Sequence, residues 1–450
     1  MIKNIIKSLK PSSTLQINEI SNKLEKEGKK IFKFGFGQSP FKVPSNIVNE
    51  LKKNAHQNKY LPMQGLEELR ESIAQYISKK KNYKYLNSNI IIGPGSKELM
   101  FLLQILFDGE ILLPAPSWVS YAPQAIIGRN KVRWIETKSE NNWFPLAKEI
   151  EEIIIKDKKK KYLLFINSPN NPTGQVCNNL NEISELTKKY KLFFLSDEIY
   201  SELNFDGKYK SISNYSPENT IISTGLSKWC GAGGWRLGYF ILPNNLSEIT
   251  NQLKVLASET FSSVSSPIQY AAIEAHKNDY SNYINHSKNI LKSVGNYVYE
   301  NLKSNNVLIN KPQGGFYLLP EFINKKFSTS AELCSNILKD SDRLIFIVYK
   351  NQPDVKSKHI LDAKVQAHSS LRNEYSISFE LDAIGSDRFA SYTGRSIGKS
   401  VAISLDGEIL LAPVINARIN NGKFMISGFE TYTEAENVAL SVLGSKIKCP

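Results

Sequence analysis

The stretch Ser223-Thr-Gly-Leu-Ser-Lys-Trp-Cys-Gly-Ala-Gly-Gly-Trp-Arg-Leu-Gly-Tyr239 places an amine, Lys228, and a permanent cation, Arg236, on one short glycine-rich segment. A lysine amine can condense with an aldehyde, and burial or neighbouring cations can lower its pKa for that task. An arginine can hold a phosphate through two parallel hydrogen bonds. The pair therefore predicts a site for a molecule that carries both groups, as pyridoxal phosphate does. Taken alone, the segment fits a basic loop after a strand equally well.

Apolar runs of strand length alternate with helix-length segments on both sides of this stretch, from about residue 45 to 290. The predicted strands are Asn89–Ile92, Glu110–Leu113, Tyr162–Ile166, Leu192–Leu195, Thr220–Ser223 and Tyr239–Ile241. Short β-branched or aromatic runs between helices predict an α/β fold with a largely parallel sheet that is covered on both faces. An amphipathic helix is predicted before it, over residues 15–28.

Polar motifs follow three of these strands: Gly93–Lys97, Asn167–Gly174 and Asp197–Tyr200. Ligands on such sheets bind at the carboxyl ends of the strands, so we expect the three motifs to lie together with Lys228. Gly95, Ser96 and Lys97 offer backbone N–H groups at a predicted helix start, which suits a phosphate. A helix start capped by Ser96 is the alternative.

Four further residues suit the ring of the same cofactor. Asp197 could keep a pyridine nitrogen protonated, and Tyr200 and Asn171 could reach a phenolic oxygen. Trp118 could stack on the ring. Each has an ordinary structural alternative: an N-cap aspartate, a packed tyrosine, a turn asparagine before proline, and a core tryptophan.

Four motifs in the same order resemble the class I/II aminotransferases, which are pyridoxal phosphate-dependent enzymes of fold-type I. They are Asn167–Gly174, Ser196–Tyr200, Ser227–Tyr239 and Gly314–Tyr317, and the resemblance covers residues 1 to about 340. It implies a large domain with a mostly parallel seven-stranded sheet (residues 45–290) and a small α+β domain (residues 1–44 and 291–341). It also implies a homodimer.

The resemblance implies roles for individual residues. Lys228 would bind the cofactor covalently and move protons, with Asp197 and Tyr200 as its catalytic partners. The cofactor would be held by Gly95, Ser96, Lys97, Trp118, Asn171, Asp197, Tyr200, Lys228 and Arg236, and by Tyr60 of the neighbouring subunit. The substrate would contact Gly37, Trp118 and Asn171. Gly225 departs from the pattern, because some relatives have a phosphate-binding serine there.

The character of the chain changes near residue 341. Short alternating strands are predicted at Arg343–Tyr349, Glu374–Leu381, Lys399–Leu405 and Glu408–Leu411, with an exposed connection over residues 350–358. Residues 342–450 are predicted to form a separate α+β domain, in which Asn373–Leu443 resembles the P1 head region of the SecD protein-export subunit. The resemblance rests on Phe379–Gly385, Gly398–Ile403, Ala412–Ile415 and Ile426–Gly428. Two features of the aminotransferases are not found after residue 341: a Pro-Gly-x-x-Phe-Gly loop and the arginine that binds the substrate α-carboxylate. Arg372 is only a weak substitute for that arginine.

Bulk composition excludes several other classes. The net charge of +14 suggests nucleic-acid binding. The charge arises from scattered lysines in the first 341 residues, because residues 342–450 hold 13 Lys and Arg against 12 Asp and Glu and are nearly neutral. No apolar run is long enough for a membrane span, and no apolar signal-peptide block begins the chain, so we expect a cytoplasmic protein. The four scattered cysteines predict neither disulfides nor a metal site.

Three functions therefore remain open from sequence. The leading hypothesis is an aminotransferase that acts on an α-amino acid and a 2-oxo acid, fused to a SecD-like module and impaired by loss of the carboxylate arginine. A carbon–sulfur lyase of the same fold is the second. The third is a non-enzymatic interaction or export-related protein.

Overall fold

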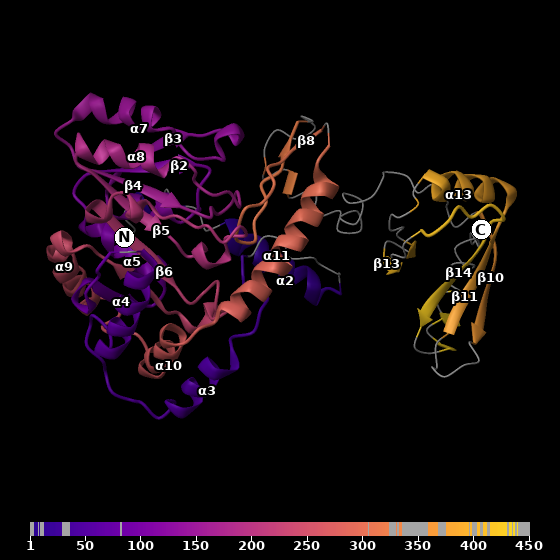
Figure 1. Cartoon of the computed structure of the whole chain (residues 1–450), viewed down its shortest axis with the longest axis horizontal. Helices are drawn as coiled ribbons and strands as arrows, with labels where there is room; N and C mark the ends of the chain where they lie inside the picture. Colours follow the sequence, from indigo (N-terminus) through magenta and orange to yellow (C-terminus); the bar gives the residue numbers. More distant parts are fainter. Residues whose placement is uncertain are drawn as a thin grey trace. The chain divides into compact units, whose positions relative to one another are not determined.

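The computed structural model describes residues 4–7, 9, 13–28, 37–81, 83–304, 306–323, 330, 333–334, 359–367, 375–395, 397, 403–405, 408–411, 415–429, 432–433, 435–436 and 439. The chain divides into two compact units, Met1–Lys325 and Lys326–Pro450 (Figure 1). Each unit has its own sheet. The predicted division at residues 44, 290 and 341 remains a prediction.

A seven-stranded sheet forms the centre of the first unit, in the order β1-β7-β6-β5-β4-β2-β3. Its strands are β1 (Ile90–Gly93), β2 (Glu110–Ala115), β3 (Lys131–Glu136), β4 (Tyr162–Asn167), β5 (Leu192–Asp197), β6 (Thr220–Gly225) and β7 (Gly238–Ile241). Strand β7 runs in the direction opposite to the other six strands, which are parallel to one another. The predicted fold, a mostly parallel seven-stranded sheet, is confirmed.

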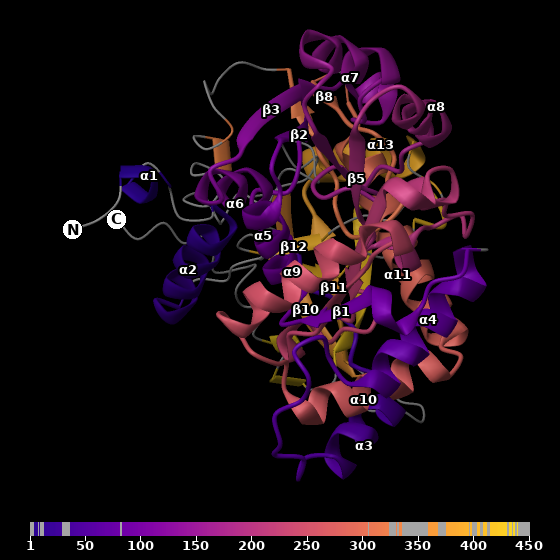
Figure 2. The ribbon, with the colours of Figure 1, turned by 90° about the vertical axis from the view of Figure 1, so that its left-hand side faces the viewer.

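Helices cover both faces of this sheet. One face packs against α4 (Glu67–Lys81), α7 (Ala147–Ile154), α8 (Leu180–Glu185) and α10 (Ser266–Lys277), and α3 (Ser45–Lys53) packs on α10. The other packs against α5 (Ser96–Leu106), α6 (Tyr121–Ile127) and α9 (Ser247–Ser258). Neighbouring strand residues alternate between the two cores: Ile90 and Ile92 belong to one and Ile91 to the other. Figure 2 shows α3 and α10 side by side.

The remaining elements of the first unit are α1 (Asn4–Lys7), α2 (Ser13–Lys26), α11 (Ser281–Leu302) and the short pair β8 (Val307–Leu308) and β9 (Glu321–Phe322). Helix α2 agrees with the helix predicted over residues 15–28. Within the described part of the chain, we find no helix that is both long and apolar enough to cross a membrane.

The second unit contains an antiparallel sheet in the order β10-β11-β14. Its strands are β10 (Ile360–Ala367), β11 (Tyr375–Leu381) and β14 (Lys423–Phe429), accompanied by α13 (Ala383–Arg395) and the hairpin β12 (Ile403–Leu405) with β13 (Glu408–Leu411). Ile377 and Phe379 pack with Ala363, Ala435 and Ala439 in its core. Of the sequence predictions, the strand Arg343–Tyr349 and the connection 350–358 lie outside the described residues.

The strand register brings the polar motifs to one edge of the first sheet. Asn167, Asp197 and Ser223 are neighbours on β4, β5 and β6, each near the carboxyl end of its strand. Asn167 Nδ2 donates to the backbone oxygen of Asp197 at 2.9 Å, which fixes the two strand ends together. This edge therefore carries the candidate site.

Candidate active site

Lys228 follows β6 and lies at the centre of the site. Its Nζ donates to the backbone oxygen of Gly37. The same Nζ lies 5.7 Å from the ring centre of Tyr200 and 5.7 Å from that of Phe316. Burial lowers the pKa of the lysine to about 8, against the opposing influence of Asp197, and the nearby Arg236 lowers it further. About a tenth of the amine is therefore uncharged at pH 7 and about half at pH 8, and the uncharged form is the one that attacks an aldehyde.

Asp197, the last residue of β5, is 4% exposed. Burial raises the pKa of its carboxyl to about 6, although a hydrogen bond from the Tyr121 hydroxyl to Oδ2 at 2.6 Å lowers it. The backbone N–H of Ile199 donates to Oδ1 at 3.3 Å. No described lysine or arginine forms an ion pair with this carboxylate. A protonated pyridine nitrogen would supply the missing cation.

Tyr200 joins two polar side chains beside Lys228. Its hydroxyl lies 2.9 Å from that of Tyr317, and Asn171 is a further hydrogen-bond partner. Burial, followed by the neighbouring Tyr317, raises the pKa of Tyr200 well above its usual value, so the phenol stays protonated and can donate. Gly37 packs on this pair: a Cβ atom there would lie 1.7 Å from the Tyr317 hydroxyl oxygen, so a larger residue would force the Tyr317 side chain to shift.

Arg236 and Lys97 meet at the start of α5. The guanidinium donates to the backbone oxygens of Gly233 at 3.0 Å and Pro94 at 3.3 Å. Burial lowers the pKa of Lys97, and Arg236 lowers it further. Neither cation forms an ion pair with a carboxylate among the described residues. Two unpaired cations at the N-terminus of an eleven-residue helix suit a phosphate group.

The other predicted residues divide into two cases. Trp118 lies beside the cluster, with its ring edge-to-face with Tyr121 at 5.3 Å and the Lys97 ammonium 5.5 Å from its centre. Tyr60, between α3 and α4, is 92% exposed and is not brought to the cluster in this chain. Arg372 lies outside the described residues.

The cluster fits pyridoxal phosphate by the chemistry of its unpaired groups. It offers a partly uncharged amine for the aldehyde, a buried carboxylate without an ion-pair partner among the described residues for the pyridine nitrogen, and two cations without such a partner for the phosphate. Gly95 leaves space for the guanidinium, since a Cβ atom there would lie 2.4 Å from Arg236 Nη2.

The departure at Gly225 has a steric reason. A Cβ atom at this position would lie 2.7 Å from the backbone oxygen of Leu237 and 2.8 Å from Cα of Gly238 on β7. A serine could not be accommodated without moving β6 and β7 apart. Gly225 therefore allows β6 and β7 to pack closely and offers no side chain to a phosphate.

Sequence reasoning missed Tyr121 and gave no role to Tyr317. Tyr121, the first residue of α6, follows Trp118 by three residues, and the two rings lie edge-to-face at 5.3 Å. That spacing was a usable signal for Tyr121. The contact of Tyr317 with Tyr200 joins residues 117 positions apart, and no local sequence pattern predicts it.

Gly95→Ala is expected to weaken cofactor binding and to destabilise the fold. Gly95 has φ +92° and ψ 152°, a conformation that is nearly exclusive to glycine, so the change should cost about 1–3 kcal/mol in unfolding free energy. The added methyl group would also displace the guanidinium. Urea unfolding and absorbance titration with pyridoxal phosphate measure the two effects. Gly234→Ala is the control, because a Cβ atom there meets nothing within 4 Å.

Tyr121→Phe is expected to weaken cofactor binding about tenfold to a hundredfold at neutral pH, since a hydrogen bond to a charged group is worth about 1.5–3 kcal/mol. Without the hydroxyl, the pKa of Asp197 should rise above its present value of about 6. The defect should therefore shrink as the pH rises. Dissociation constants measured between pH 6 and 9 check this. Tyr190→Phe, which breaks a similar bond to the distant Glu151, is the control, and an equal loss there would contradict the assignment.

Comparisons with known proteins agree with this geometry. Residues 29–358 match the family model "Aminotransferase class I and II", and residues 335–447 match "SecDF, P1 head subdomain". An aspartate aminotransferase of Bacillus sp. (strain YM-2) is 33% identical over 71% of this chain and 83% of its own length. That of Bacillus subtilis is 32% identical over 76% and 86%.

Solved structures of aspartate aminotransferases also align with this chain. The aspartate aminotransferase of Thermotoga maritima aligns with a TM-score of 0.69 and 28% identity, over 76% of this chain and 89% of its own. The enzyme of Thermus thermophilus with maleate aligns with a TM-score of 0.67 and 26% identity, over 71% and 85%.

Proposed function

Because the chain belongs to the class I and II aminotransferase family, we propose that it transfers the amino group of aspartate to a 2-oxo acid at the Lys228 site. Membership makes the chain a pyridoxal phosphate-dependent transaminase. The choice of aspartate is supported by the names of similar proteins, most of which are aspartate aminotransferases. The observation that carries the proposal is the partly uncharged Lys228 amine near a buried acid, Asp197, that forms no ion pair with any described residue.

When bound, pyridoxal phosphate supplies an aldehyde carbon for the amino group and a ring that accepts electrons from the substrate Cα. We propose that Arg236, Lys97 and the amides at the start of α5 hold its phosphate. Asp197 would hold the proton on the pyridine nitrogen. Tyr200 and Asn171 would donate to the phenolic oxygen, while Trp118 covers the ring.

Lys228 would then take the proton from the substrate Cα and return it. Only the uncharged amine can accept that proton, so the active fraction should increase as the pH rises through about 8. The backbone oxygen of Gly37 accepts a hydrogen bond from Nζ and so orients the amine. Phe316 and Tyr200 flank the amine and limit its contact with water.

The test is product formation from aspartate and a 2-oxo acid acceptor by the protein loaded with pyridoxal phosphate. We expect a new 2-oxo acid from aspartate at a rate above that of the Lys228→Ala variant. A panel of other amino acids identifies a different donor. Failure to form product with every member of the panel would contradict transamination, whereas pyruvate release from cystathionine without an acceptor would favour a lyase.

We propose that substrate carboxylate binding is weak in this chain. The family arginine for that group was not found from sequence, and the weak substitute Arg372 lies outside the described residues. Its loss would remove about 1.5–3 kcal/mol of a charge-assisted hydrogen bond. A raised KM with kcat largely kept is therefore expected. A KM that rises further in Arg372→Ala would instead assign the clamp to Arg372.

The SecD-like segment is proposed to be separate from catalysis, since every site residue named above other than Arg372 belongs to Met1–Lys325. Removal of residues 342–450 should then leave the pyridoxal phosphate dissociation constant within about twofold. A homodimer is proposed as well, with the exposed Tyr60 reaching the partner's phosphate site. Gel filtration coupled to light scattering checks the dimer. Cytoplasmic location remains a prediction.

A further inference from the structure

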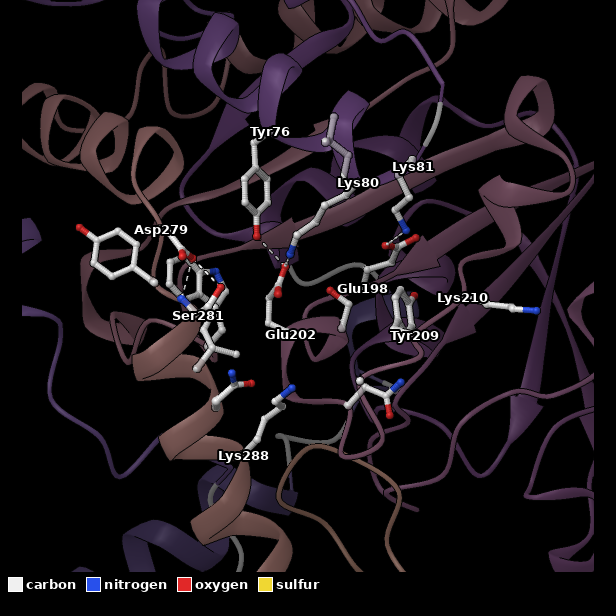
Figure 3. A pocket seen from close by; sticks show the side chains of 18 of the residues that line it. Tyr76, Lys80, Lys81, Glu198, Glu202, Tyr209, Lys210, Asp279, Ser281 and Lys288 are labelled. Atoms are coloured by element: carbon white, nitrogen blue, oxygen red, sulfur yellow. Dashed lines mark hydrogen bonds and ion pairs between the residues drawn. The ribbon is translucent and has the colours of Figure 1, made fainter.

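A cavity of about 620 Å³ lies in the first unit between α4, the segment 198–215 and the start of α11 (Figure 3). We call it the α4–α11 cavity, and we propose that it binds a small organic monocarboxylate with an aromatic body. Its volume lies within the range of about 300–1,000 Å³ that is typical of small-molecule sites. The mechanism above uses none of the side chains that line it.

The cavity and the candidate active site share two segments of chain, but different residues of these segments belong to each. Asp197 and Tyr200 belong to the active site, whereas Glu198 and Glu202 line the cavity. In the same way, Lys228 belongs to the active site and the next residue, Trp229, lines the cavity. The two sites are therefore distinct and can be separated by mutation.

The acidic side chains of the cavity already have partners. Glu198 pairs with Lys81 at 2.6 Å, and both side chains are almost fully buried. Glu202 pairs with Lys80 and accepts a hydrogen bond from Tyr76 at 2.8 Å. Asp279 accepts from the backbone N–H of Ser281 at 2.8 Å. The negative charges of the lining are thus neutralised or hydrogen-bonded within the protein.

One cation is left for a ligand. The Lys288 side chain extends from α11 toward the carboxylates of the cavity, as Figure 3 shows, but it forms no ion pair with any described carboxylate. Lys210 also lines the cavity, but its amine points away from the other side chains. Lys288 therefore presents an unpaired ammonium to the interior.

The remaining walls combine amide and hydroxyl side chains, such as Asn204, Asn285 and Ser201, with aromatic side chains that favour an aromatic body. Tyr76, Tyr209, Tyr280 and Trp229 contribute flat apolar surface, and Ile284 adds an aliphatic contact. A single unpaired ammonium balances one negative charge. The lining holds four lysines against three carboxylates, so its net charge of one positive unit balances a singly charged anion better than a doubly charged one such as phosphate. A monocarboxylate matches both the charge and the walls.

The test is isothermal titration of the full chain, loaded with pyridoxal phosphate, with 4-hydroxybenzoate. We expect saturable binding that is about tenfold to a hundredfold weaker in Lys288→Ala, the range for loss of a charged hydrogen bond. Lys288→Arg should restore it in part. Lys210→Ala should bind as the parent does, because its amine points away, and so should Lys228→Ala, whose change lies in the other site.

Four results would overturn the proposal. They are absence of binding to the parent protein, equal binding by Lys288→Ala, loss of binding in Lys228→Ala, and tighter binding of inorganic phosphate than of 4-hydroxybenzoate. The third result would place the carboxylate in the active site, and the fourth would show that the cavity prefers a more highly charged anion without an aromatic body.

Discussion

Lys228→Ala is expected to lower the rate of amino-group transfer by at least about 10⁴-fold. The change removes the covalent anchor for the cofactor and the proton-transfer group together, and proton transfer alone contributes about 10²–10⁴-fold. Noncovalent binding of pyridoxal phosphate should persist, because Arg236, Lys97 and Asp197 remain in place. Initial rates with aspartate and equilibrium dialysis with the cofactor separate the two effects.

The covalent bond itself gives a second measurement that does not depend on turnover. Borohydride reduction of the loaded parent protein should fix the cofactor on the peptide that carries Lys228, as seen by mass spectrometry. The variant should show no fixed cofactor. Lys148→Ala, at an exposed position of α7, is the control and should behave as the parent does. Fixation on another lysine in the parent would contradict the central role of Lys228.

The fold could be predicted largely because its strands are buried on both faces. Strands β4 and β6 appear in the sequence as continuous apolar or β-branched runs, and the structure extends each only by one or two residues. Strand β3 was missed for the opposite reason. It lies at the edge of the sheet, Ile135 is its only buried residue, and charged side chains such as Lys131 and Arg133 interrupt the apolar pattern.

The candidate site was predictable as far as it depends on strand ends. Asp197 ends β5 and Asn171 follows β4, and the parallel register of these strands brings their carboxyl ends to one edge, so sequence and topology together place both residues near Lys228. The contacts that tune these residues were not predictable. The bond between Tyr121 and Asp197 joins positions 76 residues apart, and the pKa values depend on burial, which only the packed fold defines.

Asp197→Asn is expected to lower amino-group transfer by about 10³-fold or more, because a neutral amide cannot hold the proton on the pyridine nitrogen that lets the ring accept electrons. Loss of a preorganised charge at a reacting group typically costs about 10²–10³-fold, and weaker cofactor binding adds to this. Rates at saturating pyridoxal phosphate distinguish the two contributions. Asp206→Asn, at an exposed position, is the control.

The same change should stabilise the protein when the cofactor is absent. Burial raises the pKa of Asp197 to about 6 in the folded state, against about 3.9 in an unfolded chain. The folded protein therefore binds more protons between these values, and its stability falls as the pH rises from about 4 to about 6. Above pH 6 the buried carboxylate costs about 1–3 kcal/mol, which the asparagine avoids. Urea unfolding without cofactor should show a gain at pH 7 that shrinks toward pH 4. An equal gain at both pH values would mean that the charge of Asp197 is not its cause.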